Sequence, residues 1–492
     1  MIYVEENFEH VSEVIYTAVD KNIEYVKKLL INNTDVVFRE FIIKDKKLSL
    51  IYIDGMADKN LLNEYLLSPL MSMADKVNNL SEVKDRLINV SDMKEIKKMN
   101  DAILSILSGE SVLFLDGLNY CYSIANRAWP NRGVGEPSGE TTLRGSREAF
   151  TETIRFNTAL VRRRIRDTRL RIESTQIGVR SKTDVAILYM DDIVDKSILK
   201  RLKKRLESIK LDAILDSGYI EQYIEDNKYT PFPQVQSTER PDVVAAALYE
   251  GRIGIIVDNS PFVLIVPAVL ATFLQSPDDY YNRWLNGSGV RVLRTISIII
   301  ALILPSLYVA ATSFHISLIP SKLAYAMARG REGVPFPAYM EVLFMELSLA
   351  ILIQAITKLP KAIGSTIGIV GGLIVGQSAV SAGLISPIMV IILGITAIST
   401  FLIPNYNVTS AFSAFRVLFI ILSAFLGLYG IMLGIMFMLI HLTRLKSFGV
   451  PYLAPLVGLQ LTDMKDTFVR LSFKIFKYRP TFNRVRNKIR QK

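Results

Sequence analysis

The residues in this chain that best fit a chemical role are polar side chains inside long apolar runs. Glu341 and Glu346 lie in an otherwise apolar stretch at 339–357, and Gln377 lies late in a second apolar stretch. A carboxylate or an amide inside hydrocarbon is costly unless water or a protein partner solvates it. These three residues are therefore candidates either for a water-filled path or for contacts with other parts of the protein.

Four glycines at four-residue spacing lead up to Gln377. They are Gly364, Gly368, Gly372 and Gly376. At 3.6 residues per turn they form one slowly rotating stripe along a helix, and small residues at this spacing allow helices to approach closely. The stripe predicts a packing face, and the sequence leaves open whether that face packs within one subunit or between subunits around a pore.

The elements that must position these residues are membrane-spanning helices. Between Lys361 and Arg444 lie 82 residues with one charged side chain, Arg416. One spanning helix needs only about 20 apolar residues, so this region predicts several crossings. We predict four spans, at 295–314, 364–383, 385–403 and 417–440, with 339–357 as an interfacial segment or an extra span.

The distribution of charge predicts the orientation of these spans. From Arg444 to the end there are twelve Lys and Arg residues against Asp463 and Asp466. Basic residues that flank a span favour the cytoplasmic side, and the chain opens without the pattern of a signal peptide. Both ends are therefore expected in the cytoplasm, which requires an even number of spans and favours four. Membrane topology and anionic lipid explain the basic tail better than nucleic acid does.

The first 288 residues predict an α/β module of two related subdomains. Strand–turn–helix patterns at 50–62 and 187–199 share matched Tyr-x-Asp and Asp-Lys pairs, and a second strand ending in Asp116 or Asp258 follows each. Short strands that alternate with helices are typical of α/β layers. The strand-end aspartates fit helix caps as readily as ligands. The predicted domains are 1–35, a variable segment; 36–133, the first subdomain; 134–288, a linker helix and the second subdomain; 289–443, the membrane domain; and 444–492, the basic tail.

Enzyme chemistry has little support in the sequence. There is no glycine-rich phosphate loop, and three histidines with one cysteine, Cys121, suggest neither a catalytic triad nor a metal motif. We therefore expect no catalytic residue, no metal and no cofactor. The arginine-rich stretch at 162–171 is either a site for phosphate or acidic lipid or, as is more common, a solvated helix face.

Several longer motifs resemble those of one family. The chain resembles the A-subunit family of bacterial spore-germination nutrient receptors over about 130–460. It departs from the family pattern at Ser146 and Asn259, two turn positions where Pro and Gly are expected. The motifs that carry the resemblance are Glu136-Pro137-Ser138-Gly139-Glu140, Arg144-Gly145-Ser146-Arg147-Glu148, Arg162-Arg163-Arg164-Ile165-Arg166, Pro231-Phe232-Pro233-Gln234, Thr238-Glu239-Arg240-Pro241-Asp242, Glu250-Gly251-Arg252, Asp258-Asn259-Ser260-Pro261-Phe262, the run from Gly368 to Gln377, and Ser447-Phe448-Gly449-Val450-Pro451-Tyr452.

The resemblance implies a nutrient receptor of the spore inner membrane, in which the A subunit works with a transporter-like B subunit and a lipoprotein C subunit. It also implies a homo-oligomer, expected to be a ring of five, that releases cations when a nutrient binds. The glycine stripe would then pack the ring, Gln377 would offer polar atoms to ions, and Glu341 or Glu346 would favour cations. The alternatives are a scaffold that does not conduct and a small-molecule sensor built from the α/β region.

The first prediction concerns topology. Cysteines introduced near Lys200 and near Lys488 should react with a membrane-impermeant maleimide only after the membrane is permeabilised, because both ends of the chain are expected in the cytoplasm. Labelling efficiency before and after permeabilisation is the measurement. Reaction of the tail cysteine in intact membranes would contradict an even number of spans.

Overall fold

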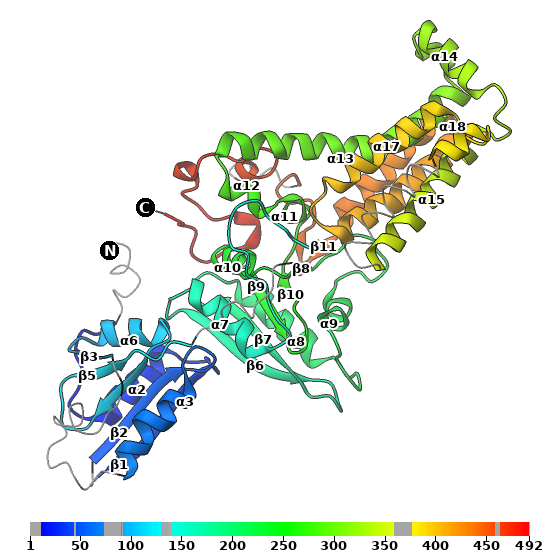
Figure 1. Cartoon of the computed structure of the whole chain (residues 1–492). Helices are drawn as coiled ribbons and strands as arrows, with labels where there is room; N and C mark the ends of the chain where they lie inside the picture. Colours follow the sequence, from blue (N-terminus) through cyan, green and yellow to red (C-terminus); the bar gives the residue numbers. More distant parts are fainter. Residues whose placement is uncertain are drawn as a thin grey trace. The chain divides into compact units, whose positions relative to one another are not determined.

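The computed structural model describes residues 11–43, 46–72, 90, 92–128, 137, 139–358, 376–457 and 463–491. They divide into two compact units, which we describe separately (Figure 1). The first unit contains Met1–Asp226, Val235–Pro267 and Phe476–Lys492, and the second contains Asn227–Gln234 and Ala268–Ile475.

The first unit contains two five-stranded antiparallel sheets that share one strand order. If the strands of each sheet are numbered along the chain, both sheets have the order 1-2-4-5-3. This common order confirms the predicted α/β fold with two related halves. The first sheet is β1 (Val36–Ile43), β2 (Lys46–Ile53), β4 (Ser111–Leu115), β5 (Cys121–Ile124) and β3 (Met93–Ile96), and the second is β6 (Leu170–Ile177), β7 (Thr183–Met190), β9 (Ile253–Val257), β10 (Val263–Val266) and β8 (Gln236–Thr238).

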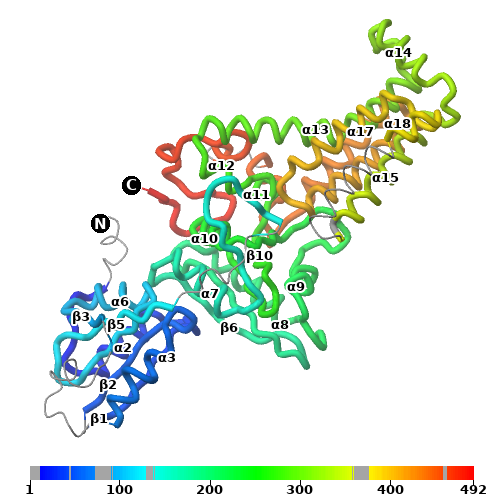
Figure 2. Tube along the Cα trace, in the orientation of Figure 1, coloured from blue at the N-terminus to red at the C-terminus, as the bar shows by residue number. Residues whose placement is uncertain are grey.

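The helices of the two halves correspond as well. In each half one helix precedes the first strand, a helical segment follows the second strand, and another helix precedes the fourth strand. Figure 2 traces the chain through both halves, coloured along the sequence. The helices of the first half are α2 (Val19–Leu29), α3 (Lys59–Leu61), the π-helix η1 (Leu62–Leu67), α4 (Ser68–Ser72) and α6 (Met99–Leu107), and those of the second half are α7 (Ile154–Arg164), α8 (Lys196–Glu207), α9 (Ser217–Ile224) and α10 (Pro241–Tyr249).

The aspartates at the strand ends start helices in both halves. Asp116 Oδ1 accepts a hydrogen bond from the backbone N–H of Val19, the first residue of α2, at 3.3 Å. Asp258 Oδ1 accepts one from Ile154, the first residue of α7, at 3.0 Å. The first N–H groups of a helix have no partner within the helix. These two carboxylates therefore act as caps supplied by a distant part of the chain.

The recurring Asp-Lys pair also marks a helix start. Asp58 Oδ1 accepts hydrogen bonds from the N–H groups of Asn60 and Leu61, at 2.9 and 3.1 Å, at the start of α3. Asp195 Oδ1 accepts one from Ser197, at 2.7 Å, at the start of α8. Aspartate is among the preferred residues at this position, where its side chain replaces the missing backbone acceptor. The repeat in the sequence thus has a local structural cause.

The arginine-rich stretch holds the two halves together. Arg162 lies in α7 and is fully buried; its Nε and Nη2 donate to the two carboxylate oxygens of Asp35 at 3.0 and 2.8 Å. Arg163 and Arg164 pair with Glu148. Arg162 therefore lies neither on a solvated helix face nor in a free phosphate site. Its side chain forms a buried ionic contact between the two halves.

The second unit is a bundle of apolar helices with short elements at its ends (Figure 1). Within the described residues, three helices are long and apolar enough to cross a membrane: α13 (Trp284–Ser313), the portion Ala338–Ile356 of α15 (Ala338–Lys358), and α18 (Tyr406–Arg444). The apolar helix α17 (Pro387–Phe401) is shorter. The remaining elements are α11 (Leu270–Leu274), α12 (Pro277–Tyr281), η4 (Ile316–Leu318), α14 (Ser321–Arg331), β11 (Lys446–Ser447), β12 (Val450–Pro451), η5 (Met464–Asp466) and η6 (Phe473–Ile475).

Helix α18 is a hairpin of two antiparallel arms. Its backbone leaves the helical region at Gly427, where φ is 60° and ψ is −138°. The ring of Phe415 lies 6.1 Å from that of His441, whereas a straight helix would place these residues about 39 Å apart. A Cβ atom on Gly434 would lie 2.7 Å from the ring of Phe419. Glycine at the turn and at the contact allows the arms to meet.

The hairpin changes how the predicted spans are placed. The predicted span 417–440 contains the turn at Gly427, so it does not run as one straight helix. The arms 406–426 and 428–444 are each roughly 25 to 30 Å long, which is close to the thickness of a hydrocarbon core. Spans 295–314 and 385–403 overlap α13 and α17, and 339–357 overlaps α15. Most of 364–383 lies outside the described residues, and the number of spans stays a prediction.

The second prediction tests the contact between the two halves of the first unit. Asp35→Asn should lower the free energy of unfolding of this unit by about 3–5 kcal/mol, because it leaves the buried Arg162 guanidinium without its countercharge. The measurement is thermal unfolding of the detergent-purified full chain, monitored through the protease resistance of the first unit.

The matched control is Asp212→Asn, since Asp212 lies 3.6 Å from Arg180 in an ion pair whose side chains are both largely exposed. Such pairs contribute about 1 kcal/mol or less. Equal effects of the two substitutions would contradict a special role for the buried pair.

Candidate functional site

One arginine connects the helices of the bundle. Arg416 lies on the first arm of α18 and is 5% exposed. Its Nη1 donates to the backbone carbonyl of Ala301 on α13, at 3.2 Å, and to Thr400 Oγ1 on α17, at 3.1 Å. Its Nε lies 3.1 Å from Glu346 Oε1 on α15. A single side chain therefore contacts the three other apolar helices α13, α15 and α17.

Glu346 is paired within the bundle. Its carboxylate is 7% exposed and faces the Arg416 guanidinium as an ion pair. Sequence reasoning left open whether Glu346 faces a wet path or a partner, and the structure provides the partner. Two opposite charges that meet in an apolar interior avoid much of the cost of an isolated charge.

Glu341 occupies a second charged position at one end of the bundle. Its Oε1 accepts a hydrogen bond from the backbone N–H of Ser386, the residue that caps α17, at 2.5 Å. Its Oε2 lies 3.9 Å from Arg331 Nη2 at the end of α14. The Ser386 hydroxyl lies 3.1 Å from the hydroxyl of Tyr308 on α13. Each of the two carboxylates predicted from the sequence thus faces an arginine.

The glycine stripe is described only at its last member. Gly364, Gly368 and Gly372 lie outside the described residues. Gly376 is buried, and a Cβ atom there would lie 3.7 Å from Val390 on α17, an ordinary contact distance. Gln377 follows it on the exposed side of a helical turn. The structure therefore brings Glu341, Glu346 and Gly376 into the bundle and leaves Gln377 on its surface.

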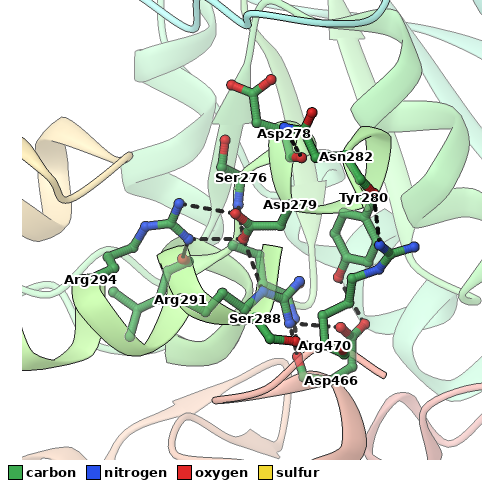
Figure 3. A network of polar contacts seen from close by, with 12 residues as sticks. Ser276, Asp278, Asp279, Tyr280, Asn282, Ser288, Arg291, Arg294, Asp466 and Arg470 are labelled. Carbon is green, nitrogen blue, oxygen red and sulfur yellow. Dashed lines mark hydrogen bonds and ion pairs between the residues drawn. The ribbon is translucent and has the colours of Figure 1, made fainter. Parts of the chain in front are cut away.

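A further ionic network lies where α13 begins (Figure 3). Asp279 on α12 is buried and accepts hydrogen bonds from Arg291 Nε at 2.9 Å and from Arg294 Nη1 at 2.9 Å. Asp466 accepts from Arg291 Nη1 at 2.7 Å and from the Tyr280 hydroxyl at 2.8 Å. This network ties the start of α13 to α12 and to the segment at 463–475.

Sequence reasoning missed the roles of Arg416 and of this network. A single charged side chain, Arg416, in an 82-residue stretch, with a carboxylate in a neighbouring apolar stretch, was a signal from which the pairing with Glu346 could have been expected. Arg291 and Arg294 directly precede the predicted span 295–314, a position that by itself indicates only residues flanking a span. Asp466, a partner of Arg291, is 175 residues from it in the sequence, and no local pattern indicates that contact.

A chain with two related α/β halves and a bundle of membrane-capable helices held by buried ion pairs is a membrane protein with a large α/β module. The family model described as Bacillus/Clostridium GerA spore germination protein matches residues 24–482. The chain therefore belongs to the GerA family of spore germination proteins, which confirms the resemblance found in its motifs.

Individual relatives agree with this assignment. Spore germination protein KA of Bacillus subtilis is 40% identical over 483 residues, which cover 97% of this chain and 89% of that protein. Spore germination protein GerLA of Bacillus cereus is 41% identical over 436 residues, or 88% and 89% of the two chains. The crystal structure of the N-terminal domain of the A subunit of the Bacillus megaterium spore germinant receptor GerK3 is 34% identical, with a TM-score of 0.42, and covers 53% of this chain and 98% of that one.

The third prediction tests the central ion pair. Glu346→Gln should lower the amount of folded protein in the membrane, because it leaves Arg416 without its countercharge at a cost of about 3–5 kcal/mol. The double variant Glu346→Gln/Arg416→Gln removes both charges and should recover much of the loss. Protein abundance and thermal stability in detergent are the measurements.

Glu332→Gln is the control, because Glu332 is an exposed carboxylate in the same unit. Normal abundance of Glu346→Gln, or a double variant no better than the single one, would show that the pair does not hold the bundle together.

Proposed function

We propose that this chain is the channel-forming A subunit of a nutrient-responsive spore germination receptor, and that copies of it form a ring that releases cations across the spore inner membrane. Membership of the GerA family supports a role in germination. The helices that are able to span a membrane support a location within one. In this proposal the ring contains five copies of the chain. Its expected partners are a transporter-like B subunit and a lipoprotein C subunit.

The observation that carries the proposal is a polar face on the surface of the bundle. Gln377, Ser378 and Ser381 are exposed on one helical turn, next to the buried Gly376. Gln377 and Ser381 are four residues apart and so lie on one side of the helix. An amide and hydroxyls that face lipid would lose their hydrogen bonds to water. Water, lipid headgroups or another subunit therefore have to cover this face, and a pore lined by several copies would supply the water.

The ion pairs argue against an ion path beside Glu341 and Glu346 within one copy of the chain. Glu346 and Arg416 compensate each other's charge, and Glu341 faces Arg331. Compensated charges attract passing cations weakly, because their opposite fields cancel at a distance. The exposed polar face around Gln377 is thus a better candidate for the pore lining than Glu346.

The fourth prediction tests conduction directly. The purified full chain in liposomes should release potassium down its gradient, and Gln377→Leu should lower the rate roughly tenfold, since it replaces a polar lining group by an apolar one. Ser348→Ala is the control, because the Ser348 hydroxyl already donates to the carbonyl of Phe344 on its own helix. If the wild-type chain and Gln377→Leu released potassium at the same rate, Gln377 would not line the pore.

Two other functions remain as alternatives with different outcomes. A scaffold would show no flux while it still assembled with its partner subunits. A sensor has one supporting observation, a cavity of about 490 Å³ between β6 and α8, whose lining includes Glu173, Lys203 and Leu206. Binding of a nutrient to the full chain that is lost in Lys203→Ala would favour the sensor.

A further inference from the structure

Helix α14 lies at the end of the bundle that contains Glu341. Figure 2 shows its trace reaching beyond the ends of α13 and α15. Met327 is the buried residue of the helix, and a Cβ atom on Gly330 would lie 3.8 Å from Pro387 of α17. Arg331 reaches back to Glu341 at 3.9 Å. These contacts fix which side of α14 faces the bundle and leave the opposite side outward.

The outward side of α14 carries two cations with a tyrosine between them. Lys322, Tyr325 and Arg329 are exposed, and Tyr325 is 76% exposed. Their spacing of three and four residues places them on one face of the helix. Tyrosine and basic residues together are typical of the headgroup region of a membrane, where the ring meets apolar chains and the cation meets phosphate.

Exposed apolar side chains continue from this face toward the bundle. Ile316 and Leu318 in η4 are 60% and 65% exposed, and Leu323 at the start of α14 is 49% exposed. They follow Phe314, which ends α13 and is itself exposed. Exposed apolar side chains of a helix that is able to span a membrane are thus followed by further ones in the segment that leads to Lys322 and Arg329. A water-exposed loop would not keep so much apolar surface in one stretch.

We propose that residues 314–329 lie in the headgroup region of the membrane at this end of the bundle, with Lys322 and Arg329 bound to the phosphates of anionic lipids. Ile316, Leu318 and Leu323 enter the boundary of the acyl chains, and Tyr325 lies between the two cations at the level of the headgroups. This interaction surface depends only on the bundle being in a membrane, so it stands apart from ion conduction.

The experiment places a reporter on this segment of the full chain. Leu323→Cys is labelled with an environment-sensitive fluorophore; the native Cys121 is buried and stays unlabelled. The protein is reconstituted in nanodiscs of phosphatidylcholine alone or with phosphatidylglycerol, and quenching by headgroup-labelled lipid is compared with quenching by iodide in water. We expect lipid quenching and protection from iodide, both stronger in the anionic nanodiscs. Soluble glycerol phosphate should not compete, since it offers the phosphate without the membrane.

Two double variants make the test specific. Lys322→Gln/Arg329→Gln should abolish the difference between the nanodiscs, because each cation near an anionic surface strengthens attachment about fivefold. Arg444→Gln/Lys446→Gln removes two exposed cations, one at the last residue of the second arm of α18 and one just beyond it, at the other end of the bundle, and should leave the difference unchanged.

Three outcomes would overturn the proposal. Full iodide quenching in both nanodiscs would mean that the segment lies in water. Shielding only after partner subunits are added would mean that it is a protein-binding surface. Equal shielding in both nanodiscs and in the variant without Lys322 and Arg329 would mean that its charges do not bind lipid phosphate.

Discussion

The bundle depends on a charge that cannot leave an apolar environment. Arg416 lies about ten residues into an arm of roughly 30 Å, so it is near the middle of that arm and too far from its ends to reach water easily. An arginine at such a depth costs about 3 kcal/mol to insert even by insertion-based scales. It is accommodated because α13 and α17 each present a hydrogen-bond acceptor and α15 presents a countercharge, Glu346. Their relative positions therefore follow from the requirement to solvate one guanidinium.

The same requirement recurs at other places in the chain. Asp279 is solvated by Arg291 and Arg294 where α13 begins, and Asp35 by Arg162 between the two α/β halves. Asp279 and Asp35 each accept at least two directed hydrogen bonds from guanidinium groups. Such bonds fix the orientation of the two groups as well as the distance between them. Burial of charge is thus used in this protein to specify which elements meet, in addition to the apolar packing that stabilises them.

The sequence allowed the fold class to be predicted more fully than the site. The duplicated Asp-Lys pair indicated two related halves because its capping is a local interaction, decided within a few residues. The strand-end aspartates recur in both halves as well, but the helices that they cap lie far away in the sequence and were not predicted. The hairpin in α18 was not predicted, since a run of apolar residues with glycines has the same composition whether it is straight or folded back. The partners of Glu346 and Arg291 were not predicted either, because they are set by contacts between distant segments. Asn259 is a case between these extremes: glycine was expected at this turn, and the φ of 67° is a left-handed conformation that asparagine also tolerates.

The turn at Gly427 also bears on the biogenesis of the protein. Between Arg416 and Arg444 there is no Asp, Glu, Lys or Arg residue, and the tip of the hairpin around Gly427 is formed by uncharged residues. The insertion machinery can pass such a tip through the bilayer without dehydrating a formal charge. The first arm, however, carries Arg416, and it is stabilised when a neighbouring helix completes the burial of this side chain. The two arms are therefore suited to enter the membrane together, as one cotranslationally inserted unit that docks onto helices already in place.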